Sequence, residues 1–230
     1  MIRRGDAWGG PVAGPPELEV AGDDVALADA VRARLRRQPE RAGAPSVRFD
    51  ASAGSDLARA VGLVGLGAAT IALDLDVITI GDEASGEVER ALSVNAVVLG
   101  PAPDRLRWWH RRRPTTVLVD GRPVFTGRAT TVLVANGQFL RGHDVVPAGH
   151  PGDGRLEVQV YALAPGERAA MHRRLPGAAH LPHPRIHAAS GRAVVVDAPG
   201  AAPLEVDGVH VGRTSALRAT IRPGAYRLLV

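Results

Sequence analysis

Cysteine and lysine are both absent from the 230 residues of this chain. The lack of cysteine excludes disulfide bonds and metal sites built on thiolates. Because there is no lysine, every permanently cationic side chain is an arginine, which can bind a phosphate through two N–H groups at once. Aromatic residues make up only 3% of the chain, so the core must be built from valine, leucine, alanine and isoleucine.

Long apolar runs are missing as well. None approaches the ~20 residues that a membrane-spanning helix needs, and the first residues lack the apolar stretch of a signal peptide. We therefore expect a cytoplasmic protein. The formal net charge is +4 and the pI is about 10.7, which allows peripheral attachment to anionic membranes. Codon bias in a GC-rich genome is the alternative explanation for the many arginines.

The hydrophobic periodicity changes near Gly67. Before it, short strand candidates alternate with helix candidates, which indicates part of a parallel α/β layer. After it, β-rich segments alternate with turn signals such as Asn136-Gly137 and Asp153-Gly154, which predicts a β-sandwich. We expect the region 164–191 to be a long connection. The predicted fold class is α/β + β, with a reduced α/β domain at 17–67 plus 216–230 and a β-sandwich domain at 68–215.

Four segments carry a more specific signal, in this order along the chain: GDDVALADAV from Gly22, SDLARAVGL from Ser55, the pair Asn136-Gly137 followed by PAGHPGDGRLEV from Pro147, and LEVDGV from Leu204 followed by PGAYRL. They resemble the motifs of the bacterial diacylglycerol-kinase-like lipid kinases. This family includes sphingosine kinases and is distantly related to NAD kinases and phosphofructokinases. The third segment is the most specific, because both of its anchors and its strand pattern agree. Ser93-Val94-Asn95 is similar to a further strand motif of the family.

The resemblance implies an α/β nucleotide-binding domain joined to a β-sandwich, with ATP phosphates in the cleft between them. Such an enzyme transfers phosphate from ATP, with Mg²⁺, to a lipid hydroxyl. The nucleotide-binding positions implied for this chain are Gly22, Asp24, Ser55 and Asp56. The first motif is degraded, because Asp23 and other side chains stand where the family has glycines whose backbone N–H groups close on phosphate.

The resemblance also implies a structural Mg²⁺ at the turn Asp153-Gly154. Asp153 would supply a carboxylate, and His150 and Arg155 would supply backbone carbonyls; hard oxygen ligands of this kind suit Mg²⁺. A plain Asp-Gly hairpin turn is the alternative. The histidines at 180, 183 and 187 have zinc-like spacing, but Pro182 and Pro184 argue against a helix there and favour loop histidines.

The position of the family's proposed general base, a glutamate, is occupied here by Val209, beside Asp207 and Gly208. Valine cannot accept a proton, and loss of a positioned base typically costs roughly 10²–10⁴-fold in rate. We therefore predict a degenerate lipid kinase with little or no activity alone. Two alternatives remain: an active lipid kinase with an unusual site, and a non-catalytic module that binds lipid or a membrane surface.

The strongest surface signal is the segment Arg105–Arg113, which places two tryptophans among five arginines. Indole rings and guanidinium groups together suit the interface of an anionic membrane. The predicted membrane-surface patch consists of Arg107, Trp108, Trp109, Arg111, Arg112 and Arg113. One buried tryptophan with a solvated basic face is the alternative, and nucleic acid, which would use the same residue types, is not expected. The expected partners are a lipid substrate or an anionic membrane surface, with a second copy of the chain as a further candidate.

Overall fold

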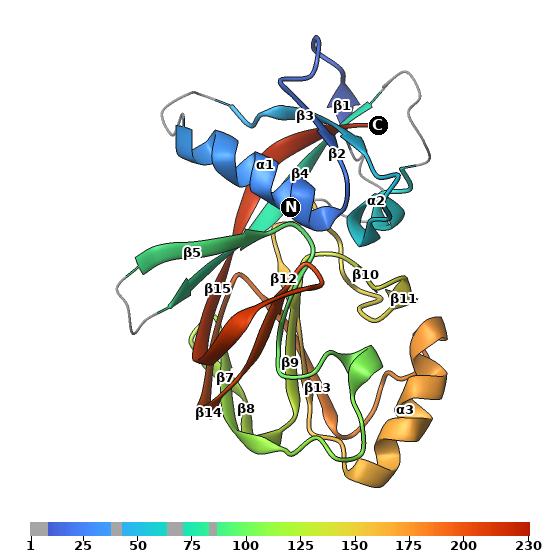
Figure 1. Cartoon of the computed structure of the whole chain (residues 1–230), viewed down its shortest axis with the longest axis vertical. Coiled ribbons are helices and arrows are strands. Elements are labelled where there is room, and N and C mark those ends of the chain that lie inside the picture. The colour runs from blue at the N-terminus through green and yellow to red at the C-terminus, as the bar shows by residue number, and fades with distance from the viewer. Residues whose placement is uncertain (1–8, 38–42, 64–70, 83–86) are drawn as a thin grey trace.

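The computed structural model describes residues 9–37, 43–63, 71–82 and 87–230. Most of the described chain is β-strand, with a few short helices (Figure 1). The helices are α1 (Asp24–Arg37), α2 (Asp56–Ala60) and α3 (Arg168–Arg174), with 3₁₀ turns η1 (Pro103–Arg105), η2 (Pro165–Glu167) and η3 (Leu175–Gly177). The strands are β1 (Gly10–Pro11), β2 (Leu18–Ala21), β3 (Ser46–Asp50), β4 (Ile71–Asp82), β5 (Glu87–Ser93), β6 (Ala96–Leu99), β7 (Arg113–Val119), β8 (Arg122–Ala129), β9 (Thr131–Ala135), β10 (Phe139–Leu140), β11 (His143–Asp144), β12 (Leu156–Tyr161), β13 (Ile186–Gly191), β14 (Ala193–Val206) and β15 (Val209–Leu229).

The first part of the structure is a small α/β layer. Strands β2 and β3 pair in parallel, and β3 pairs in parallel with the end of β15. Leu27 and Val31 on one side of α1 are fully buried, and they belong to a core cluster that also contains Val47 and Phe49 of β3. The spacing of four residues puts the two α1 side chains on the same helix face, so α1 covers the sheet.

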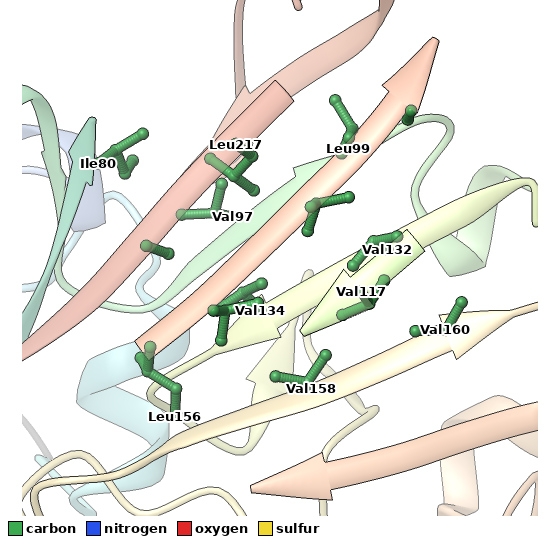
Figure 2. Packing of buried hydrophobic residues seen from close by; sticks show 14 of the residues in the cluster. Ile80, Val97, Leu99, Val117, Val132, Val134, Leu156, Val158, Val160 and Leu217 are labelled. Carbon is green, nitrogen blue, oxygen red and sulfur yellow. The ribbon is translucent and has the colours of Figure 1, made fainter. Parts of the chain in front are cut away.

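The remainder is a β-sandwich. Strand β14 pairs with β15 on one side and with both β6 and β7 on the other, so the sheet branches there. The main hydrophobic cluster lies between the strands, and the labelled side chains of β9, β12 and β15 point into it (Figure 2). Strand β9 is buried on both faces: Val132 and Val134 enter this cluster, whereas Leu133 packs on the opposite side in a cluster that includes Met171 of α3. This alternation follows from the two-residue period of a strand.

The predicted fold class, a reduced α/β layer followed by a β-sandwich, is confirmed. The boundaries predicted for the two domains stay a prediction, since β4 contributes Leu73 to the cluster under α1 and Ile80 to the sandwich cluster. The region 164–191 is more ordered than a connection, because it contains α3 and β13. The prolines and glycines of this region interrupt the hydrophobic periodicity of the sequence. Pro165 nevertheless lies in the first turn of η2, where a proline is tolerated.

Candidate functional site

A pocket of about 430 Å³ lies where the two parts of the fold meet. It brings together three of the four predicted segments, and Gly22 immediately precedes its first lining residue. Its walls carry four aspartates and two arginines, so the ionised pocket is net negative. The lining residues are Asp23, Asp24, Gly54, Ser55, Asp56, Arg59, Asn95, Leu140, Arg141, Gly142, Asp207, Gly208 and Val209.

Asp24 connects the start of α1 to the start of α2. Its carboxylate accepts a hydrogen bond from the Ser55 hydroxyl and from the backbone N–H groups of Asp56, at 3.2 Å, and Leu57, at 3.4 Å. Ser55 is the N-cap of α2 and accepts from the Ala58 N–H at 2.8 Å. Burial raises the pKa of the Asp24 carboxyl to about 6, although the hydrogen bond from Ser55 acts in the opposite direction.

Asp56 connects α2 to the turn between β10 and β11. Its carboxylate accepts the backbone N–H of Arg141 and, at 2.7 Å, that of Gly142. The Arg141 guanidinium then donates to Asp104, at 2.7 Å, and to Glu205. Both the backbone and the side chain of this pocket arginine are therefore engaged by carboxylates of the chain itself.

Asp207 closes the pocket at the turn between β14 and β15. Its Oδ1 accepts from the Ser93 hydroxyl at 2.6 Å and from the N–H groups of Asn95 and Ala96 at 3.0 Å each. Its Oδ2 accepts from the Val94 N–H at 3.0 Å. Although part of the residue is exposed, its carboxylate points back into the protein, and burial raises its pKa to about 7.

Gly22, Asp23 and Val209 complete the set of positions that the first and last segments predicted. Gly22 has φ +141°, and a Cβ there would lie 2.8 Å from the Cβ of Ala26, so the fold itself requires glycine. Asp23 caps α1 by accepting the Ala26 N–H at 3.0 Å. Val209 is 47% exposed and lines the pocket. At the start of α1, the start of α2, the β10–β11 turn and residues 94–96, backbone N–H groups donate to aspartates of the chain.

The pair Asn136-Gly137 packs tightly behind the pocket. The Asn136 amide donates to the carbonyls of Asp76 and Val94 at 3.1 Å each. A Cβ on Gly137 would lie 2.3 Å from Oδ1 of Asn95, one of the lining residues. The glycine is therefore needed for close packing against the pocket wall.

The turn around Asp153 is separate from the lining of the pocket. Asp153 Oδ1 accepts the Arg155 N–H at 2.9 Å, and the Asp153 N–H donates to the His150 carbonyl at 3.4 Å. Nearby, buried Asp76 accepts the N–H groups of Gly154, at 2.6 Å, and Gly224, at 2.8 Å. Burial raises the pKa of the carboxyl groups of Asp76 and Asp153. The nearby imidazole of His150 opposes this rise in both.

Sequence reasoning did not identify several residues that shape the site. Arg59 lies over the ring of Phe139, 5.7 Å from its centroid, and Arg141 bridges Asp104 and Glu205. Gly142 is the local signal that the sequence offers for this turn, because glycine favours positive φ, and both Arg141 and Gly142 have positive φ there. Within the described part of the chain, no group of three or more His, Cys, Asp or Glu residues could hold a metal ion. His187 instead packs on Phe125, with ring centroids 4.9 Å apart.

Comparison with known proteins identifies the family of the chain. Residues 101–230 match the family model described as the YegS C-terminal NAD kinase beta sandwich-like domain, which is more than half of the chain. The chain belongs to this family. Membership confirms the resemblance to diacylglycerol-kinase-like proteins that the four segments indicated. None of the curated proteins compared with the chain matches it in sequence.

Solved structures share the fold of this YegS-like chain at low sequence identity. A proposed diacylglycerol kinase from Bacillus anthracis str. Sterne is 15% identical with a TM-score of 0.71, over 93% of this chain and 78% of that one. A diacylglycerol kinase structure from the same strain gives 14% identity and a TM-score of 0.63, over 93% and 76%. Yeast NADH kinase complexed with NADH gives 12% and 0.51, over 92% and 60%. The similarity establishes a kinase-like fold. No helix among the described residues is long and apolar enough to span a membrane.

Proposed function

We propose that this chain keeps the fold of a diacylglycerol-kinase-like lipid kinase but transfers little or no phosphate from ATP to a lipid hydroxyl on its own. The observation that carries the proposal is the filling of the pocket's donor sites by the chain's own carboxylates. The carboxylate of Asp23 accepts a backbone N–H at the start of α1, and that of Asp24 accepts one at the start of α2. The carboxylate of Asp56 accepts one from the β10–β11 turn, and that of Asp207 accepts one from the segment 94–96. Phosphate groups would have to displace them.

Electrostatics support the same conclusion. Two like unit charges about 4 Å apart near a protein surface repel by about 4 kcal/mol. The Arg141 guanidinium, which could offset that repulsion, is paired with Asp104 and Glu205. The residues present do not fit the phosphates of ATP.

An active kinase is the second candidate, and one observation favours it. The carboxyl of Asp207 lines the pocket with a pKa raised to about 7 by burial, which is a suitable value for a general base. Against this, its two oxygens already accept four hydrogen bonds from residues 93–96, so the carboxylate is directed away from the position of Val209.

We predict no lipid kinase activity for the wild-type chain, and none for Val209→Glu, since a restored carboxylate repairs only proton transfer. The assay is transfer of labelled phosphate from Mg·ATP to vesicles that contain diacylglycerol, sphingosine or phosphatidylglycerol. Val209→Gln is the matched control for the size of the new side chain. Labelled lipid made by the wild type above a no-protein blank would contradict the proposal, and loss of that product in Asp207→Asn would assign the base to Asp207.

We also propose the Asp153 turn as a Mg²⁺ site, with the Asp153 carboxylate and the His150 and Arg155 carbonyls as ligands. The chemistry of the donor set suits a hard cation, and two carboxyl groups with pKa values raised by burial lie at this turn. Bound Mg²⁺ would stabilise the turn and supply no reacting group.

Addition of Mg²⁺ is expected to raise the melting temperature of the wild type, because a ligand at ten times its Kd adds about 1.4 kcal/mol to the free energy of unfolding. Asp153→Asn is expected to abolish the shift. Asp197→Asn, on an exposed position of β14, is the control and should keep it. An equal shift in Asp153→Asn and the wild type, or no shift in either, would contradict the site.

A further inference from the structure

Two adjacent tryptophans lie on the outside of the loop between η1 and β7. Trp108 is 71% exposed and Trp109 is 57% exposed. Their rings meet edge to face, with centroids 5.6 Å apart and planes at 88°. Burial of large apolar side chains stabilises a fold, yet two of the three tryptophans of this chain are exposed at this loop.

The exposure is imposed by a buried arginine. Arg168, at the start of α3, is 2% exposed, and its Nη1 donates to the carbonyls of Arg107, Trp108 and His110 at 2.6, 3.0 and 2.8 Å. The loop is also closed on itself, because the Arg107 N–H donates to Nδ1 of His110 at 2.9 Å. The backbone carbonyls therefore turn inward, and the indole side chains are held on the outside.

The same loop presents unpaired positive charge. Residues 105–113 include five arginines and no acidic residue. Arg112 points inward and donates to the Ala162 carbonyl at 3.3 Å, and Arg105 lies 3.8 Å from Glu205. Arg107 and Arg111 are exposed, and within the described ranges neither forms an ion pair with an acidic side chain. Burial and the neighbouring arginines lower the pKa of His110, so the positive charge comes from the arginines.

The position of the loop leaves it accessible. The segment between β6 and β7 passes beside α3, at the end of the molecule away from α1 and α2 (Figure 1). Two further exposed arginines, Arg173 and Arg174, lie at the end of α3. A membrane that approached the loop would therefore also meet the basic end of α3.

We propose that Trp108, Trp109, Arg107 and Arg111 form a docking surface for membranes rich in anionic phospholipid. Indole rings are favourable at the level of the lipid headgroups, and guanidinium groups bind lipid phosphates there. Nucleic acid suits the geometry less well, because successive bases stack on aromatic rings as roughly parallel planes, whereas these two rings are perpendicular. The inference is independent of whether the pocket transfers phosphate.

Tryptophan fluorescence tests the proposal directly. In a Trp8→Phe background, all indole emission comes from Trp108 and Trp109. Vesicles of phosphatidylglycerol and phosphatidylcholine should shift this emission to shorter wavelength, and brominated lipid should quench it. Pure phosphatidylcholine should bind weakly, and added salt should weaken binding to the anionic vesicles because it screens the arginines.

Substitutions in the loop separate the contribution of the arginines to membrane binding from that of the tryptophans. Arg107→Glu with Arg111→Glu should weaken vesicle binding by at least about tenfold, since each charge near an anionic surface is worth about 1 kcal/mol. Trp108→Ala with Trp109→Ala, followed by vesicle co-sedimentation, should weaken it by a similar factor. Arg122→Glu, at the start of β8 where it pairs with Val119 at the far end of β7, is the matched control and should change binding by less than about twofold. All of these side chains are exposed, so the circular dichroism spectrum should be unchanged.

Three results would overturn the proposal: equal binding to neutral and anionic vesicles, no quenching by brominated lipid, or an effect of Arg122→Glu as large as that of the loop variants. A labelled single-stranded RNA tests nucleic acid as the other possible ligand of this surface. Binding of that RNA through Trp108 and Trp109 without any binding to vesicles would assign the surface to nucleic acid instead.

Discussion

Replacement of Asp207 by alanine is expected to lower the free energy of unfolding by about 3–5 kcal/mol. The carboxylate is the hydrogen-bond acceptor for four donors, the Ser93 hydroxyl and three consecutive backbone N–H groups. A donor left without a partner in a buried site costs roughly 1–3 kcal/mol, and water entering from the pocket offsets part of the sum. The β14–β15 turn would then be joined to residues 93–96 only by the hydrogen bond from the backbone N–H of residue 207 to the Ala96 carbonyl.

Urea denaturation followed by circular dichroism measures this loss. Asp197→Ala removes an exposed aspartate from the same strand, β14, and should change stability by less than about 0.5 kcal/mol. Asp207→Asn keeps one acceptor oxygen but turns an amide N–H toward the Val94 N–H, so an intermediate loss is expected. A loss below about 1 kcal/mol for Asp207→Ala would show that Asp207 does not organise this corner of the pocket.

Stability should fall as the pH rises from 5 to 8. The pKa of the Asp207 carboxyl is raised to about 7 and that of Asp24 to about 6, both by burial. The unfolded values are about 3.9. The folded chain therefore binds more protons than the unfolded chain in this window, and the stability contributed by the protonated groups is lost as the pH passes through their folded pKa values. For Asp207 the loss between pH 5 and 8 is about 2–3 kcal/mol.

Two histidines are expected to raise the stability as the pH rises, so the measurement must separate their effect from that of Asp207. Burial lowers the pKa of His110 and His180, so their contribution to stability is lost as the pH falls. Denaturation curves at pH 5 and pH 8 should therefore be compared between the wild type and Asp207→Asn, because the difference cancels the histidines. A variant with the same pH dependence as the wild type would rule out titration of Asp207 in this range.

The sequence was informative where the fold depends on short segments. The Asp-Leu-Ala-Arg helix after Ser55, the Asn136-Gly137 strand end and the Asp207-Gly208 turn all fall where their motifs implied, and three of the four segments meet at one pocket. Each of these motifs places a capping or turn residue next to a hydrophobic run. Capping and turn preferences can be read from the sequence, because the residues that interact in them are close together in the chain.

The ion pairs that determine the charge of the pocket could not be predicted from local sequence motifs. Arg141 contacts Asp56, Asp104 and Glu205, which lie between 37 and 85 positions away in the chain. Arg168 is one of 28 basic residues, all of them arginines, and nothing in its neighbourhood distinguishes it as buried. Pairings of this kind depend on how the sheet brings distant segments together, which hydrophobic periodicity does not encode.

Strand β15 has a consequence for the order in which the chain can fold during synthesis. It pairs with β14 along its first part, with β4 along its second, and with β3 at its end. Neither hydrophobic core can therefore be completed on the ribosome until residues 209–229 have emerged. Until then β4 and β14 expose unpaired edges, and such edges are prone to pair with other chains. Folding of both halves of the molecule therefore depends on the same strand.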